Sequence, residues 1–105
     1  MAGERNRVIS WRMLRDFAAE HPEDASLVTL LRVWTRSVER APRWHDFAGV
    51  RRSFGTASHV KDLAFFNVGG NKYRIIARIR YGTGRVYIRA VLTHREYDRN
   101  DWLDL

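Results

Sequence analysis

The stretch that decides the fold is Phe66-Asn67-Val68-Gly69-Gly70-Asn71-Lys72-Tyr73-Arg74-Ile75-Ile76-Ala77-Arg78-Ile79-Arg80-Tyr81. From Lys72 onward, charged and apolar residues alternate, which is the period of a β-strand because successive side chains point to opposite faces. One face of a strand at Lys72–Tyr81 would then be cationic, with Lys72, Arg74, Arg78 and Arg80. The other face is apolar. We therefore expect a core beneath the sheet and a polyanionic partner above it.

A second long strand is predicted at Arg85–Thr93, after the loop Gly82-Thr83-Gly84. Its alternation places Val86, Ile88, Ala90 and Leu92 on one face and Arg85, Tyr87, Arg89 and Val91 on the other. The two apolar faces coincide only if even positions of the first strand pair with odd positions of the second. This parity favours a two-residue turn, either Gly82-Thr83 or Thr83-Gly84. The cationic face then widens to include Arg85 and Arg89.

Upstream, apolar residues recur with helical period in two segments. The expected elements are a strand at Arg7–Ser10, a helix at Trp11–Glu20 capped by Ser10, a helix from Asp24–Ser26 to Ala41, a helical turn within Trp44–Phe54, a loop at Gly55–Ser58 and a strand at Leu63–Val68. Gly69-Gly70 is predicted to form a tight turn before the first long strand. Helices followed by a meander of strands indicate an α+β fold, with the N-terminal helices packed on one face of a small antiparallel sheet.

The composition is that of a folded, basic, single-domain protein. We expect a flexible tail at residues 1–6 and one domain at residues 7–105. The net charge of +7 favours nucleic acid or another acidic surface as the partner. The chain has no cysteine, which excludes disulfides and thiolate chemistry and fits a cytoplasmic location. No membrane association is expected, because no apolar run approaches the ~18 residues of a spanning helix.

A histidine and a tyrosine follow the last predicted strand. Thr93 is expected to cap a helical turn that places His94, Tyr97 and Asp98 on one side, at spacings of three and four. RNA cleavage by the adjacent 2′-hydroxyl requires a base, an acid and cations on the phosphate. Histidine and tyrosine can transfer protons, and arginine supplies charge. The candidate catalytic residues are therefore His94, Tyr97, Arg89 and Arg74.

The other residues of the cationic face are candidates for RNA binding. This set comprises Lys72, Arg74, Arg78, Arg80 and Arg85, with Asn71 of the preceding turn. Plainer interpretations stand beside the site: His94 as a turn histidine and Tyr97 as a lid over the core. Asp98 either orients His94 or is a solvated helix end, and we favour the solvated end. Trp102-Leu103 is either a partner contact or a lid, and the sequence leaves both open. The histidine spacing predicts no metal site, and no cofactor is expected.

Two segments resemble a known family. Phe66–Ile76 resembles the FN-x-x-GNKYRL signature of HigB-type toxins in the RelE/ParE superfamily, and Thr93–Arg99 is similar to that family's TH-x-EYDK ending. Arg7–Ser10, the His21-Pro22 break and Leu31–Trp34 also fit. The departures are an additional N-terminal tail, a charge-rich Arg78-Ile79-Arg80 and Arg99 in place of the usual lysine.

The resemblance implies a toxin of a type II toxin–antitoxin system. Such a toxin would be an endoribonuclease that cleaves mRNA on the translating ribosome without a metal and so inhibits translation. Its partners would be a cognate helix-turn-helix antitoxin of the HigA type, the ribosome and mRNA. Two alternatives from other functional classes are a ParE-like inhibitor of a DNA topoisomerase that acts through protein contacts, and a plain RNA-binding module.

Overall fold

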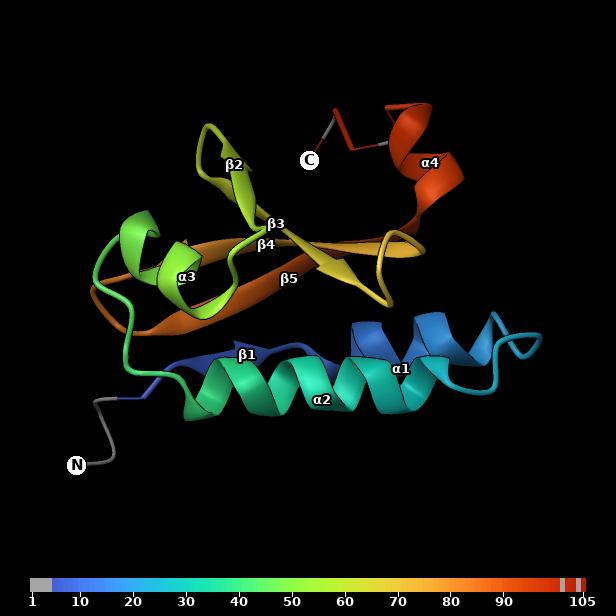
Figure 1. Ribbon diagram of the computed structural model, residues 1–105, viewed down its shortest axis with the longest axis horizontal. Coiled ribbons are helices and arrows are strands. Elements are labelled where there is room, and N and C mark those ends of the chain that lie inside the picture. Colours follow the sequence, from blue (N-terminus) through green and yellow to red (C-terminus); the bar gives the residue numbers. More distant parts are fainter. Residues whose placement is uncertain (1–4, 101, 104) are drawn as a thin grey trace.

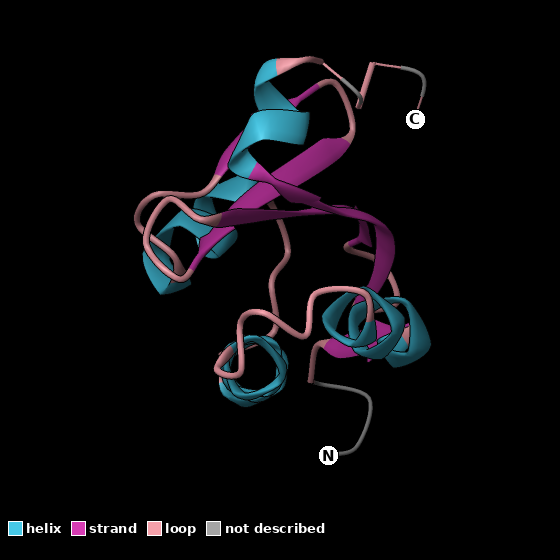
Figure 2. Cartoon of the chain, turned by 90° about the vertical axis from the view of Figure 1, so that its right-hand side faces the viewer, coloured by secondary structure: helices cyan, strands magenta, loops and turns pink. Residues whose placement is uncertain are grey.

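A computed structural model describes residues 5–100, 102, 103 and 105 (Figure 1). The elements in chain order are β1 (Arg7–Ile9), α1 (Trp11–Ala19), α2 (Leu27–Arg40), α3 (Phe47–Ser53), β2 (Ser58–Val60), β3 (Leu63–Val68), β4 (Tyr73–Arg80), β5 (Arg85–Thr93) and α4 (His94–Asp98). The strands form one sheet in the order β1-β5-β4-β3-β2. Helices α1 and α2 lie on one side of this sheet and α4 lies on the other (Figures 1 and 2). The predicted α+β class is confirmed.

Most of the core lies between the sheet and the two N-terminal helices. Helix α2 buries Leu27, Leu31, Trp34 and Val38, which follow the helical period seen in the sequence. We call the sheet face that these residues cover the inner face, and the opposite face the outer face. Burial of the α2 stripe fixes the helix against the sheet, because each fully buried aliphatic side chain contributes about 1.5–3 kcal/mol.

The junction between β1 and α1 differs from the prediction. Ser10 adopts a left-handed conformation with φ 79°, and its side chain forms no capping hydrogen bond. Its carbonyl oxygen instead accepts a hydrogen bond from the Met13 N–H at 2.9 Å. The predicted side-chain cap is therefore wrong, because Ser10 turns the backbone between strand and helix. Strand β1 also pairs parallel to β5, so the sheet is antiparallel except at this edge.

Strand β2 was not expected from the sequence, which predicted a loop at Gly55–Ser58. Ser58–Val60 pairs antiparallel with Leu63–Phe65 through a turn at Lys61, where φ is 56°. All three residues of β2 are exposed, so the strand carries no alternation of apolar and polar residues. Its short, exposed edge is typical of the strands that end natural sheets.

The hairpin between β4 and β5 confirms the predicted parity next to the turn. Arg80 pairs with Arg85, and Arg78 pairs with Tyr87, which is the register of the Gly82-Thr83 alternative. The pairing of β4 with β5 ends one residue pair before the point that a two-residue turn would require. The Gly84 N–H donates instead to the Arg80 carbonyl at 2.8 Å. Four connecting residues preserve the same parity as two, because both numbers are even.

A bulge in β5 changes the faces further along the hairpin. Ala77 pairs with Ile88 but Ile76 pairs with Ala90, so Arg89 is the additional residue. Beyond it, Val91 is part of the inner core, whereas Ala90 and Leu92 lie on the outer face. The predicted faces of Ala90, Val91 and Leu92 are thus wrong, because the bulge shifts the alternation by one residue.

This shift adds Ala90 and Leu92 to a second apolar group on the outer face. We call it the outer cluster; it consists of Leu63, Phe65, Ile76 and Leu92 with Ala90, Tyr97 and Trp102 packed against them. The outer face is therefore not uniformly cationic, since this cluster lies between the charged residues at the two ends of β4. Trp102 is a lid over the cluster, 5.2 Å from Phe65 between ring centroids, and Leu103 is 64% exposed.

The predicted N-terminal tail is only partly covered, because residues 1–4 lie outside the described residues. Asn6 is only 2% exposed and belongs to the packed fold. Its side chain donates to the carbonyl oxygens of Val38 and Pro42 and accepts from the Trp44 N–H. The boundary between tail and domain at residues 6 and 7 stays a prediction.

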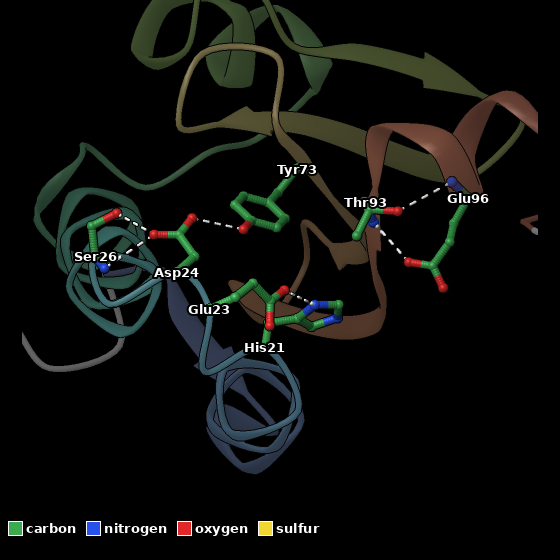
Figure 3. Close-up of polar contacts among 7 residues, drawn as sticks. All are labelled: His21, Glu23, Asp24, Ser26, Tyr73, Thr93 and Glu96. Atoms are coloured by element: carbon green, nitrogen blue, oxygen red, sulfur yellow. Dashed lines mark hydrogen bonds and ion pairs between the residues drawn. The ribbon is translucent and has the colours of Figure 1, made fainter.

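Tyr73 connects the start of β4 to the loop between the two N-terminal helices (Figure 3). Its hydroxyl donates to Asp24 Oδ2 at 2.7 Å, and Asp24 also accepts from the backbone and side chain of Ser26. Burial raises the pKa of Tyr73 to about 12, and the bond to Asp24 adds to this effect. The hydroxyl groups of Ser26 and Tyr73 lower the pKa of Asp24. The next residue, Arg74, is held on the outer face.

Replacing Tyr73 by phenylalanine should flatten the dependence of stability on pH. A raised tyrosine pKa contributes stability below pH 10 that is lost as the pH rises from 10 to about 12. The lowered carboxyl pKa contributes stability that is lost as the pH falls below the ordinary aspartate range. Y73F should therefore lose about 1 kcal/mol at neutral pH and less at both extremes. Urea denaturation across this pH range measures the difference. Y87F is the control, and an unchanged pH profile in Y73F would contradict the linkage.

Candidate catalytic site

The site is built on α4, which begins where β5 ends. Thr93 Oγ1 accepts from the Glu96 N–H at 3.2 Å, and Glu96 Oε1 accepts from the Thr93 N–H at 2.9 Å (Figure 3). This capping box confirms the predicted role of Thr93. The His94 N–H also donates to the carbonyl oxygen of Lys72 at 3.0 Å. The start of α4 is therefore fixed directly beside the start of β4.

His94 is oriented by Asp98, one helical turn further on. The His94 Nδ1 and Asp98 Oδ2 atoms lie 3.0 Å apart, and the histidine side chain is 46% exposed. A carboxylate at Nδ1 favours a proton on that nitrogen and leaves Nε2 as the nitrogen that can exchange a proton with a substrate. The Asp98 side chain is 63% exposed, as the interpretation of a solvated helix end predicts, and it also contacts His94, as the orienting interpretation predicts.

Tyr97 lies between the outer cluster and the cationic residues. Its ring is 5.9 Å from Phe65 and stacks on Trp102 at 5.7 Å. The guanidinium carbon of Arg74 lies 4.2 Å from the centroid of the Tyr97 ring, which is a cation–π contact. The interpretation of Tyr97 as a lid is thus confirmed, and the same ring places Arg74 beside the helix that carries His94.

The structure divides the predicted cations into two groups. Lys72 and Arg74 lie next to α4, and the exposed Asn71 lies in the preceding turn, where Gly69 and Gly70 adopt positive φ. Arg80 and Arg85 face each other at the other end of the hairpin, about 20 Å from Arg74 at ~3.3 Å per residue.

Arg89 belongs to neither end. The bulge residue lines a groove with Arg78 and Arg80 that also includes Ser10, Tyr87 and Ile88. Arg78 Nε is 3.0 Å from Asp62 Oδ2, so part of its charge is compensated. No hydrogen bond, ion pair or cation–π contact joins Arg89 to His94 or Tyr97 among the residues that the structure describes. As a site residue, Arg89 would act on a different part of a bound RNA from Arg74.

Asn67 was missed as a site residue, although it lies in the quoted motif. It pairs with Arg74 across β3 and β4, and the two side chains share the outer face. Within the described part of the chain, Asn67 Oδ1 and Arg74 Nε are buried without a hydrogen-bond partner. Such atoms are rare in native proteins and mark places where a ligand or water completes the bonding. The parity of this hairpin could have placed Asn67 on the same face as Arg74, because odd positions of β3 pair with even positions of β4.

The described residues include neither a metal-binding cluster nor a membrane-spanning helix. They contain no group of three or more histidine, cysteine, aspartate or glutamate residues that could hold a metal ion. None of their helices is long and apolar enough to cross a membrane. A metal-independent reaction stays a prediction.

Helices on one face of a small sheet and a basic outer face define a RelE-like α+β protein. The chain belongs to the HigB_toxin family, described as the RelE-like toxic component of a toxin–antitoxin system, which matches residues 28–100. It is similar to the mRNA interferase toxin HigB of Escherichia coli (strain K12), with 30% identity over 92 residues, 87% of this chain and 86% of that protein. The mRNA interferases HigB of Escherichia coli O157:H7 and Shigella flexneri match equally well. A toxin of such a system implies a cognate antitoxin.

Proposed function

We propose that this toxin is an mRNA interferase that cleaves mRNA on the ribosome and so stops translation. The observation that carries the proposal is the arrangement of His94, oriented by Asp98, on the same short helix as Tyr97, which holds Arg74. An acid–base group and a cation at one end of a basic sheet are what phosphodiester cleavage requires. The names of the similar proteins support the same activity.

The proposed reaction is attack of the RNA 2′-oxygen on the adjacent phosphorus. The bond from phosphorus to the 5′-oxygen breaks, the 2′-hydroxyl proton goes to a base, and a proton from an acid completes the leaving 5′-hydroxyl. The products are a 2′,3′-cyclic phosphate and a 5′-hydroxyl end, so the reaction consumes no cofactor. His94 performs one of the two proton transfers, and Arg74 stabilises the charge that develops on the phosphate.

Tyr97 has two roles in this proposal. Its ring fixes Arg74, and its hydroxyl lies on the same helix as His94 for the second proton transfer. Tyrosine is a weak proton donor near neutrality, so the free protein should be a slow catalyst. We infer that the ribosome contributes by holding the RNA with its 2′-oxygen in line with the bond that breaks.

The partners follow from this activity. The ribosome and mRNA are the targets, which places the protein in the cytoplasm, and the cognate antitoxin is of the helix-turn-helix, HigA-like kind. The phosphates on either side of the cleaved bond would be bound by Lys72, Arg78, Arg80 and Arg85, with Arg89 in the groove between them. This division follows from the positions of the cations along the hairpin.

The test is cleavage of a defined mRNA in a purified translation system, with and without ribosomes. We expect cleavage with ribosomes, cyclic phosphate ends on the products and little cleavage of free mRNA. Intact mRNA in translating reactions would refute the proposal. DNA damage in expressing cells with intact mRNA would instead support a topoisomerase inhibitor.

Arg74 should contribute more to cleavage than a cation at the far end of the hairpin. R74A removes a charged hydrogen-bonding group worth about 1.5–3 kcal/mol, which corresponds to a loss of roughly 10- to 100-fold in kcat/KM. R74K should recover only part of this loss, because an ammonium group lacks the planar contact with Tyr97. R85A has the same charge change and should lose much less. Equal losses in R74A and R85A would contradict the assignment.

A further inference from the structure

A second cationic surface lies on the helix side of the molecule. We call it the rear groove; it runs between β1 and α2, and its arginines are Arg5, Arg7, Arg32, Arg36 and Arg40. Glu39 is the one carboxylate among the described residues that line it. The candidate catalytic site uses none of these residues, because α2 and α4 cover opposite faces of the sheet (Figures 1 and 2).

The arginines form two rows. Arg32, Arg36 and Arg40 are spaced four residues apart on α2, which gives steps of about 6 Å along one side of the helix. Arg5 and Arg7 are two residues apart on the extended chain of the opposite wall, so their side chains share a face. A narrow anionic ridge lying in this groove would have guanidinium groups on both sides.

The positive charge of the groove is only partly compensated within the described part of the chain, because Glu39 faces five arginines. No ion pair joins any of the five arginines to a described carboxylate. Glu39 Oε2 accepts a hydrogen bond from the Val8 N–H at 3.0 Å, so this carboxylate holds the backbone of the edge strand. Like charges gathered in this way repel one another, and a polyanion relieves that repulsion.

The chemistry of the groove favours a phosphate backbone over a protein. The cores of protein interfaces are apolar and depleted of charge. The one large apolar side chain here, Trp11, lies beneath the guanidinium of Arg32 at 5.8 Å from the ring. The guanidinium thus lies over the ring face on which single-stranded RNA would stack an unpaired base. Arginine rows without a free aromatic face fit the phosphates of a helical RNA segment, which is recognised by its shape.

We propose that the rear groove binds the phosphate ridge of a ribosomal RNA helix while the outer face holds mRNA. This inference rests on the proposed function, because it assigns a second contact to the same ribosome-bound state. The groove would contribute affinity for the ribosome, and His94 would contribute chemistry. Loss of one should therefore leave the other intact.

Binding to purified ribosomes at several salt concentrations tests the proposal. The variant R36Q/R40Q removes two groove charges, and R12Q/R15Q is the matched control, with the same charge change at exposed α1 positions outside the groove. The slope of log affinity against log salt should fall by about 2 for the groove variant, or roughly one unit per lost phosphate contact. The slope for the control variant should fall by much less. R5Q/R7Q removes the opposite row and should reproduce the groove variant.

Measurements of cleavage distinguish this inference from the proposed function. At saturating ribosome concentrations, R36Q/R40Q should cleave mRNA at the wild-type rate, and H94A should bind ribosomes with the wild-type salt slope without cleaving. If the wild-type protein fails to cleave, the proposed function fails. If it cleaves but the groove variants, folded by circular dichroism, bind ribosomes like the control, the inference fails. Loss of antitoxin binding alone in R36Q/R40Q would also overturn it and identify an acidic protein as the occupant.

Discussion

Replacing His94 by alanine is expected to slow cleavage of ribosome-bound mRNA by a factor of about 10²–10⁴. General acid–base catalysis contributes this much when a positioned side chain transfers the proton. The imidazole is exposed at the start of α4 and is oriented by Asp98, so its removal takes away the proton transfer and leaves the sheet intact. Single-turnover cleavage with the toxin in excess over ribosomes measures the chemical step.

The controls distinguish chemistry from packing and charge. H45A removes an exposed histidine between α2 and α3 and should cleave at the wild-type rate. D98N keeps the size of the orienting group but weakens its attraction for Nδ1, so a smaller loss of cleavage is expected. If H94A cleaves as fast as H45A, His94 takes no part in the reaction.

Replacing Phe66 by alanine is expected to lower the free energy of unfolding by about 3–5 kcal/mol. Phe66 is 1% exposed, and its ring lies 5.1 Å from Trp34 and 5.3 Å from Phe54 between centroids. Removal of the ring leaves a cavity among side chains that are fixed by the sheet and by α2. Since the free energy of unfolding of domains of this size is about 5–15 kcal/mol, this loss is a large fraction of the stability. Urea denaturation monitored by circular dichroism measures it.

Phe65 offers a matched comparison on the outer face. It is equally buried, but it contacts Tyr97 at 5.9 Å and Trp102 at 5.2 Å. F65A should therefore reduce cleavage per folded molecule, because Tyr97 and Arg74 lose their support. F66A, kept folded at low temperature, should cleave normally per folded molecule. Equal activities of the two folded variants would show that the outer cluster does not position the site.

Periodicity predicted the elements with one clear apolar stripe. Helix α2 carries such a stripe, whereas β3 is predicted from its apolar and aromatic content, and the structure confirms both elements. The bulge escaped prediction because Arg89 looks like one more step of the alternation, and only the pairing of Ile76 with Ala90 reveals it. Strand β2 escaped because its residues are all exposed, so nothing in its sequence differs from a loop.

The residues of the site could be named from motifs, but their contacts could not. His94 and Tyr97 come from the ending that resembles the family, and the spacing of four correctly placed Asp98 beside His94. The contact between Arg74 and Tyr97 joins residues 23 positions apart, so it depends on the tertiary fold. The separation of Arg89 from α4 likewise depends on the bulge, which no local pattern indicates.

Because α4 is short, the site has its own local free energy of opening. A five-residue helix is far below the length that is stable alone, so the capping box and the outer cluster hold it in place. In native-state hydrogen exchange, such a segment opens at a lower free energy than the core strands. Each opening would carry His94 and Tyr97 away from Arg74 while the rest of the molecule stays folded. A ligand or partner that favours the docked or the open form of α4 could then turn the toxin on or off without unfolding it.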